Sequence, residues 1–302
     1  MQYIYKGWWI TMDNLKVMVK KRIILFVVLS IFIGWSISLL IPILGLVYGE
    51  GPSVVILAAM MFSPAISSLL TRLITKEGYQ NMYLRPNFKG NGKKYILVFF
   101  GASIMLFLSC AIYFLIFPSM LDTNLTQLNE MLDLMGPKSL TAINMLVIAI
   151  LQVILIGPII NIIPTLGEEL GWRGYLLPKL RELHSDRIAL VITGVIWGVW
   201  HLPAIVMGHN YGTNYVGYPW LGVLAMIIFC IILGIIEGYA TIKLESVIPA
   251  AMIHSTINAG AAIPILLANK EYNTLIGPAI TGLAGGIPFI ILAIILFIKV
   301  DN

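Results

Sequence analysis

The sequence predicts an all-α protein, a polytopic membrane helix bundle of about eight transmembrane helices. Of its 302 residues, 59% are hydrophobic and 11% are charged, whereas a soluble domain has roughly 25% charged residues. A water-soluble globule is therefore excluded. The 27 glycines fit helices in lipid, because small residues let helix backbones approach closely. Cys110 and Cys230 lie in apolar runs, so we expect them to pack rather than to form a disulfide.

Eight stretches reach, or come close to, the roughly 20 apolar residues that a helix needs to cross a bilayer. They are 23–48, 54–74, 95–117, 141–163, 188–207, 220–242, 247–268 and 277–298. The first is too long for the apolar core of a signal peptide and has no small-residue cleavage site behind it, so we expect it to remain as an anchor. No long linker interrupts 23–302, which therefore reads as one membrane-embedded domain.

Apolar residues recur at helical spacing before the first stretch, with lysines between them. They are Ile4, Trp8, Met12, Leu15 and Val19. This pattern predicts that residues 1–22 form an amphipathic segment in the cytoplasmic membrane interface.

The positions of Lys and Arg predict the orientation in the membrane, because cytoplasmic loops retain these residues. Five precede the first stretch, six lie in 72–94, four in 173–187, and Lys243 and Lys299 complete 17 of the 19 on one side. We therefore expect a multi-pass protein with both termini in the cytoplasm. The net charge of +5 is spread over these loops rather than gathered in one patch, so no nucleic-acid partner is expected.

Ionisable and amide side chains inside the spans are candidate functional residues, because burying them in a bilayer is costly. They form four groups: Glu168 and Glu169 with Arg173, then His201, then Glu237, and then His254 with Asn258.

The first group follows Pro164, at the end of the fourth stretch. Glu169 and Arg173 are four residues apart, so on a helix they share a face and can form an ion pair with the acid first. Glu168 then points about 100° away and stays free. On these residues alone, both carboxylates could instead belong to a cytoplasmic helix start, where the helix dipole favours them.

The two histidine positions allow different readings. His254 and Asn258 are one helical turn apart, so they address a single point in the bundle and indicate a binding or reaction site. His201 alone fits an interhelical hydrogen bond as well as catalysis. Glu237 lies about a turn from the cytoplasmic end of its span, where we expect it to snorkel to the interface or to pair with Lys243.

Together these residues supply what acyl-transfer hydrolysis needs. A base must deprotonate water, and donors must face the oxyanion that develops on the attacked carbonyl. A carboxylate, two imidazoles and an amide on three helices meet both requirements.

The motifs resemble those of the CAAX-protease and bacteriocin-processing (Abi-type) family of intramembrane endopeptidases. They are Glu168-Glu169-x-x-x-Arg173, Trp197-x-x-x-His201 and His254-x-x-x-Asn258, in this order on successive spans within a motif core of about 141–268. Two positions depart from the family pattern. Trp197 stands where phenylalanine is more common, a mild change because both rings pack apolar surface, and Glu237 stands where an apolar residue is expected.

The resemblance implies a bundle of about eight helices with a cavity that opens towards the cytoplasm. It implies that Glu168 activates water with help from His201, while His254 and Asn258 hold the oxyanion and the Glu169–Arg173 pair orients the motif helix. This mechanism needs no cofactor. The alternative is a divalent metal such as zinc, held by Glu168, His201 and His254.

The implied partner is a membrane-associated or lipidated peptide or protein. The motif resembles the bacterial branch, so we expect a bacterial cell membrane and a bacteriocin leader, a regulatory membrane protein or a self-immunity target as substrate rather than a prenylated protein. Two other functions stay open: a non-proteolytic bacteriocin-immunity or scaffold protein, and a proton-coupled transporter, for which inverted repeats would be expected.

Depth along the helices gives a geometric expectation. His201 is 13 residues into its stretch and His254 seven, or about 20 Å and 10 Å at 1.5 Å per residue. For the two to meet, either the stretch edges shift by about a turn or the seventh helix begins near Lys243. Glu168 must also lie within the bilayer, so we expect the fourth helix to continue through Pro164 with a kink.

Overall fold

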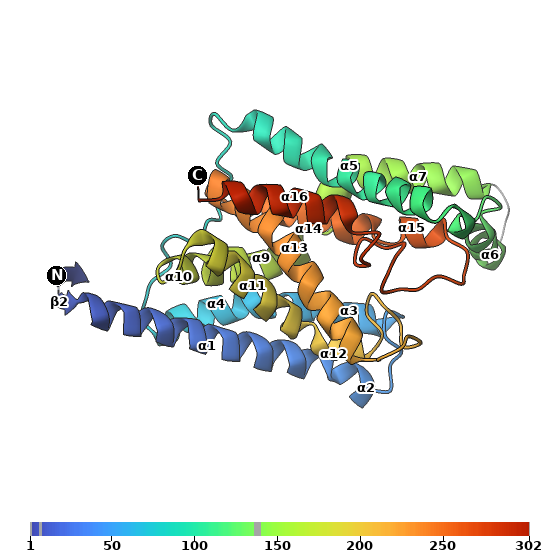
Figure 1. The fold of residues 1–302 in the computed structure, drawn as a ribbon. Helices are drawn as coiled ribbons and strands as arrows, with labels where there is room; N and C mark the ends of the chain where they lie inside the picture. Colours follow the sequence, from blue (N-terminus) through green and yellow to red (C-terminus); the bar gives the residue numbers. More distant parts are fainter. Residues whose placement is uncertain (1, 6–7, 136–139, 302) are drawn as a thin grey trace.

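The computed structural model describes residues 2–5, 8–135 and 140–301, and almost all of their regular structure is helical (Figure 1). The first half contains β1 (Gln2–Tyr5), β2 (Trp8–Thr11), α1 (Met12–Ser38), α2 (Leu40–Ile43), α3 (Pro52–Met61), α4 (Ser63–Ile74), α5 (Gly92–Ile116), the 3₁₀ turn η1 (Pro118–Met120), α6 (Thr126–Met135) and α7 (Ala142–Leu155). The second half contains α8 (Gly157–Ile160), α9 (Ile162–Gly171), the π-helical turn η2 (Trp172–Leu176), α10 (Leu177–Arg181), α11 (Asp186–Trp200), α12 (Leu202–Val206), α13 (Trp220–Leu244), α14 (Ile248–Gly260), α15 (Ile263–Leu266) and α16 (Ile287–Lys299). The predicted all-α bundle is confirmed.

Five helical segments of the described chain are long and apolar enough to cross a membrane. They are Asp13–Ile43, Pro52–Ile74, Gly92–Ile116, Trp220–Leu244 and Ile248–Leu266. The other three predicted spans are divided or shortened. The fourth becomes α7, α8 and α9, the fifth becomes α11 and α12, and only the second half of the eighth is the helix α16.

Prolines account for the division of the fourth span. Pro158 stands in the first turn of α8, where its missing N–H and its ring interrupt the helix that ends at Leu155. Pro164 lies in the first turn of α9, and the helix continues through it to Gly171, as predicted. The interruptions fall before Pro164, at Ile156 and Asn161.

The N-terminal segment differs from the prediction. Gln2–Tyr5 pairs antiparallel with Trp8–Thr11, so the helical spacing that begins at Ile4 does not give a helix before Met12. The two strands are rich in Tyr, Trp and Ile, residues with high strand propensity. The helical spacing therefore does not correspond to a helix in Gln2–Tyr5 or Trp8–Thr11, and the position of this segment in the membrane interface stays a prediction. Lys6 lies outside the described residues, as does Lys138, one of the two cations predicted on the far side.

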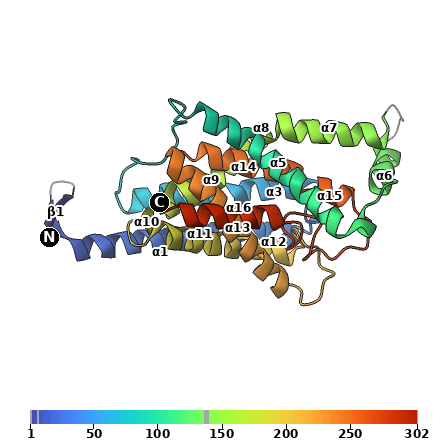
Figure 2. The same cartoon turned by 45° about the horizontal axis from the view of Figure 1, so that its top comes forward.

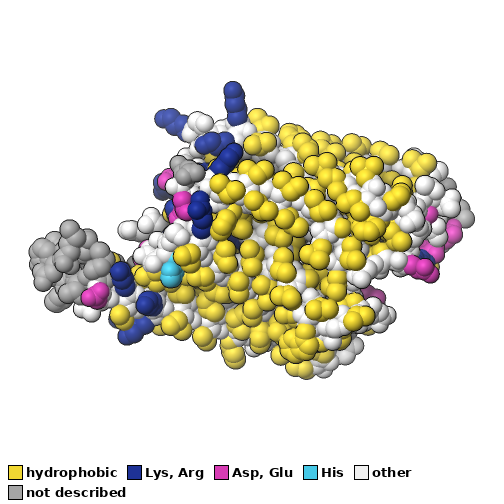
Figure 3. All heavy atoms as spheres, in the orientation of Figure 1, with side chains coloured by type: hydrophobic (Ala, Val, Ile, Leu, Met, Phe, Trp, Pro, Cys, Tyr) yellow, Lys and Arg dark blue, Asp and Glu magenta, His cyan; other side chains and the backbone are white. Residues whose placement is uncertain are grey.

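Charged and apolar side chains occupy different parts of the surface (Figure 3). Lys and Arg gather at the end of the bundle where the two termini lie, and an apolar band covers the helices beyond it. Phe32 of α1, Val55 of α3 and Leu97 of α5 are examples of exposed apolar side chains on the long helices. A lipid-facing belt of this kind identifies a multi-pass membrane protein.

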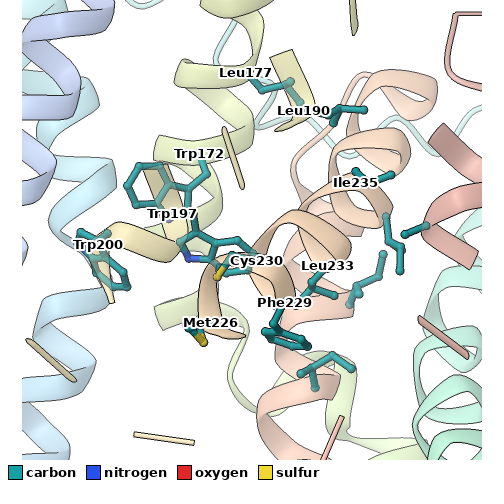
Figure 4. Packing of buried hydrophobic residues seen from close by; sticks show 14 of the residues in the cluster. Trp172, Leu177, Leu190, Trp197, Trp200, Met226, Phe229, Cys230, Leu233 and Ile235 are labelled. Atoms are coloured by element: carbon teal, nitrogen blue, oxygen red, sulfur yellow. The ribbon is translucent and has the colours of Figure 1, made fainter. Parts of the chain in front are cut away.

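The interior is packed around α11 and α13. Figure 4 shows Trp172, Trp197 and Trp200 grouped beside Met226 and Cys230 of α13. Cys230 is free and fully buried, and the second cysteine is also free and buried, as predicted.

Glycines bring neighbouring helices close together. A Cβ at Gly198 would lie 2.5 Å from Ile227 Cα, and one at Gly194 would lie 2.6 Å from Ile231 Cα. The α11 backbone therefore rests directly on α13, which fixes the positions of the side chains that follow Gly198 on α11.

Gly171 makes the corresponding contact between α9 and α4, and its replacement by alanine is expected to destabilise the protein. The added Cβ would lie 2.6 Å from the Pro64 carbonyl carbon, which is backbone and cannot rotate away. Overpacking of this kind costs typically about 1–3 kcal/mol. Thermal unfolding in detergent micelles measures the loss. Gly101→Ala is the matched control, because its Cβ would meet only Leu97 Cδ1, at 4.0 Å. An equal effect of both substitutions would contradict the close approach of α9 and α4.

Candidate active site

The first motif lies on α9 and the π-helical turn that follows it. Glu168 is 2% exposed, and Glu169 and Arg173 are fully buried. Gly167 lets α9 approach α3, since a Cβ there would lie 2.9 Å from the Met61 carbonyl oxygen. Single π-turns inside helices are frequent at functional sites.

The predicted ion pair between Glu169 and Arg173 is present. Arg173 Nη1 donates to Glu169 Oε1 over 2.9 Å. Both groups are fully removed from solvent, so each is the counter-charge that makes burial of the other tolerable.

Glu237 completes this charge cluster, and here the prediction was wrong. Its side chain is fully buried, and its Oε2 lies 2.6 Å from Arg173 Nη2. It neither snorkels to the interface nor pairs with Lys243, whose Nζ lies over the Tyr239 ring. Gly234, one turn earlier on α13, leaves room for the guanidinium, since a Cβ there would lie 3.2 Å from Arg173 Nη2. The signal in the sequence was a lone acid in an apolar span, which requires a buried cation.

His254 joins the cluster through Glu169. Its Nδ1 lies 3.0 Å from Glu169 Oε1, the oxygen that also accepts from Arg173. Because an ionised carboxylate only accepts hydrogen bonds, Nδ1 carries a proton here, and Nε2 is the ring atom left for substrate. Glu169 therefore orients His254 as well as α9.

Trp197 does more than pack. Its Nε1 donates to Glu168 Oε2 over 2.8 Å, so the indole supplies a hydrogen bond that a phenylalanine could not. The Arg173 guanidinium carbon lies 4.2 Å from the centre of the Trp197 ring, and the His254 ring centroid lies 5.4 Å away. Trp197 thus contacts both a carboxylate and the histidines, and the expectation that its ring only packs apolar surface was wrong.

His201 follows α11 directly, where the next helix begins. Its Nδ1 lies 2.9 Å from the Trp197 carbonyl oxygen, which can only accept, so Nε2 is again the free ring atom. The His201 ring stacks on the ring of His209, with centroids 5.7 Å apart and planes 4° apart.

His209 is a site residue that sequence reasoning missed. It lies in the connection after α12 and shares a 2.6 Å hydrogen bond with Tyr48 through Nδ1. Burial lowers the pKa of His209 to about 4, so the imidazole is neutral at pH 7. It belongs to none of the motifs, and its position beyond the fifth apolar stretch was no indication that it would fold back on His201.

Residues of the second motif (Trp197 and His201) and of the third (His254 and Asn258) line one cavity of about 470 Å³. His209 lines it as well. Its apolar wall includes Met226, Phe229 and Leu233 of α13, Ile257 of α14, Ile265 of α15, and Ala261 and Ala262 between these two helices. Asn258 is exposed to this space, whereas Glu169 and Arg173 do not line it, and Glu168 adjoins it through its hydrogen bond with Trp197.

Trp197 explains how His201 and His254, which lie at different distances from the starts of their helices, reach the same cavity. The seventh helix does not begin near Lys243, which belongs to α13, but at Ile248. The Trp197 ring lies 5.8 Å from the ring of His201 and 5.4 Å from the ring of His254. The two histidines therefore share one cavity from different depths, with the indole between them.

The remaining wall of the cavity comes from the connections 208–212 and 272–281. Figures 1 and 2 place the neighbouring helices α12 and α15 away from the end that carries the termini. The cavity therefore extends towards the end opposite to the Lys and Arg side chains (Figure 3). The predicted cytoplasmic opening and the predicted cytoplasmic termini both require a cavity at the Lys- and Arg-rich end, so these two predictions do not fit together.

The donor groups do not fit a catalytic zinc ion. Within the described ranges, the group of three candidate ligand atoms closer than 4.8 Å to one another is Glu169, Glu237 and His254, not the expected set with Glu168 and His201. Arg173 already bridges Glu169 and Glu237, and His254 Nδ1 is bound to Glu169. A guanidinium repels a divalent cation, and this one already engages two of the three candidate ligands.

Comparison with known proteins agrees with this arrangement. Residues 142–260 match the family model described as Type II CAAX prenyl endopeptidase Rce1-like. The CAAX prenyl protease 2 of Methanococcus maripaludis is 33% identical over 93 residues, which are 30% of this chain and 34% of that protein. The match thus spans about a third of the relative's length. All three motifs lie inside the matched segment, so the part of the chain that carries them is similar to CAAX proteases.

Proposed function

We propose that the chain is an intramembrane endopeptidase that hydrolyses a peptide bond of a membrane-associated or lipidated protein or peptide. The observation that carries this proposal is the convergence of His201, His254 and Asn258 on one cavity, with Glu168 hydrogen-bonded to the Trp197 in its wall. The similarity of residues 142–260 to CAAX proteases supports the same reaction class.

In the proposed reaction Glu168 is the general base. It removes a proton from water as the water oxygen attacks the carbonyl carbon of the substrate, and His201 orients that water through Nε2. Asn258 donates a hydrogen bond from its amide to the oxyanion that forms, and His254, as an imidazolium with Nδ1 held by Glu169, donates a second from Nε2. When the tetrahedral intermediate collapses, the C–N bond breaks, and the leaving amine takes the proton that Glu168 received.

The buried charge cluster supports these groups without touching substrate. Arg173 links Glu169 on α9 to Glu237 on α13, and Glu169 holds His254 on α14. Three helices are thereby fixed relative to one another, and His254 is held in one orientation. Such support is what keeps a reaction geometry precise.

We place the protein in a bacterial cell membrane with the Lys- and Arg-rich end in the cytoplasm. The cavity then faces the other side of the membrane. This arrangement favours a peptide in the outer leaflet, such as a bacteriocin leader, over a prenylated cytoplasmic protein.

A comparison of membrane proteomes tests the proposal. Cells with the wild-type chain are expected to contain a shortened peptide that is missing when His254→Ala replaces it, because the oxyanion loses a donor. His184→Ala is the matched control, since His184 is exposed near the Lys- and Arg-rich end and should leave the product unchanged. If His254→Ala keeps every product and still protects cells from a bacteriocin, the non-proteolytic immunity or scaffold function replaces the protease.

A further inference from the structure

A second cavity, of about 360 Å³, lies at the Lys- and Arg-rich end of the bundle. It is formed by α1, α4, the connection 75–91, the π-turn and α10. Its charged lining residues are Arg22, Arg72, Glu77, Lys179, Arg181 and Glu182. It is separate from the catalytic cavity, with which it shares no lining residue.

The carboxylates of this cavity are already engaged. Glu77 is bound by Lys179, lies 3.6 Å from Arg22 Nε and accepts a hydrogen bond from the Tyr175 hydroxyl. Burial alone would raise the pKa of Glu77, but the hydrogen bond and charge of Lys179 outweigh it and lower the pKa. Glu182 is also held by Lys179. Neither acid is left to balance a further cation.

Arg181, which also lines the cavity, forms an ion pair with a carboxylate that is not among the lining residues. Arg181 binds both oxygens of Asp186, at 2.7 and 3.0 Å. With this pair included, four cations face three carboxylates. One positive charge therefore remains in the cavity.

That charge is the guanidinium of Arg72. The side chain is 4% exposed, its Nη1 donates to the carbonyl oxygens of Gly78 and Gln80, and it lies 4.9 Å over the Tyr175 ring. Its Nε has no acceptor, and among the described residues it forms no ion pair. A buried charge without a counter-charge is costly, so this arrangement calls for an anion.

We propose that this cavity binds the phosphate of an anionic headgroup. A guanidinium fork matches phosphate oxygens, and basic pockets at the cytoplasmic ends of membrane helices suit anionic lipids. Leu73 and Ile74, which follow Arg72 on α4, are 63% and 58% exposed on the lipid-facing surface. A phosphate held by Arg72 therefore has apolar surface beside it for acyl chains. The same pocket chemistry would accept free phosphate, which the experiment separates from lipid.

Thermal unfolding of the full-length protein in a neutral detergent tests the site. Short-chain phosphatidylglycerol, short-chain phosphatidylcholine and inorganic phosphate are added separately. We expect phosphatidylglycerol to raise Tm and phosphatidylcholine to leave it unchanged. If inorganic phosphate raises Tm as much as the anionic lipid, the site is a phosphate site for a soluble anion; if it has no effect, the lipid is the ligand. Equal shifts with the two lipids would overturn the proposal.

Two variants make the test specific. Gln80 lends only its backbone carbonyl to Arg72, and its exposed side chain lines the cavity, so Gln80→Glu adds a negative charge without removing a contact of the guanidinium. We expect it to raise the half-saturating lipid concentration about tenfold or more by like-charge repulsion, whereas Gln80→Ala should keep the wild-type value. Arg187→Gln, which alters an arginine outside the cavity, should keep it too. Unchanged lipid binding by Gln80→Glu would exclude this cavity as the site, whatever the outcome for peptide hydrolysis.

Discussion

Exchanging Glu168 for glutamine is expected to lower kcat/KM for peptide hydrolysis by roughly 10²–10⁴-fold, the usual contribution of a general base. The amide oxygen can still accept the hydrogen bond that Trp197 Nε1 gives to the carboxylate, so the local packing is preserved. What is lost is a group that can take a proton from water. The rate is measured on the peptide identified by proteomics, with protein amount in the membrane and Tm measured in parallel.

Trp197→Phe is the control for the same carboxylate. It removes the indole N–H but leaves a base in place, so we expect a loss well below that of Glu168→Gln. An unchanged rate in Glu168→Gln would assign the base elsewhere. A chelator gives an independent check: activity should persist in its presence, because Arg173 occupies the place between Glu169 and Glu237. Loss with the chelator and recovery with zinc would contradict the mechanism.

Replacing Arg173 by methionine is expected to have the largest effect on stability. The side chain is fully buried between Glu169 and Glu237, and its removal leaves two buried carboxylates without their cation. Removal of one partner from a buried ion pair costs about 3–5 kcal/mol, a large part of the stability of most domains. Unfolding in detergent and the amount of protein in the membrane measure the loss.

A double mutant separates the charge from the packing. Adding Glu237→Gln to Arg173→Met removes one of the stranded carboxylates, so the double variant should be more stable than Arg173→Met alone. Lys243→Met is the control on the same helix, since Lys243 contacts a tyrosine ring at the helix end and should contribute little. Strict additivity of the two substitutions would contradict the Arg173–Glu237 pair.

Features that depend on spacing along one helix were predictable from the sequence. The Glu169–Arg173 pair follows from a separation of four residues on a helix, a distance that any helix satisfies. The same holds for His254 and Asn258, which both line the cavity. The membrane bundle followed from composition, because uninterrupted apolar segments have few alternatives in water. The N-terminal strands show the limit of this reasoning, since apolar residues at helical spacing there pair as a hairpin.

Contacts between helices depend on how each helix is rotated and how deeply it is set, which spacing along one chain segment does not specify. Only the packing of α13 against the π-turn brings Glu237 to Arg173, and only the close contact of α11 with α13 holds Trp197 between Glu168 and the histidines. The stacking of His209 on His201 likewise needs a connection to fold back over the bundle. The sequence by itself therefore identified which residue types form the site and in which order they follow along the chain. Which acid meets which cation, and towards which end the cavity extends, were decided by the tertiary structure, because close packing at glycines selects one rotation of each helix over the others.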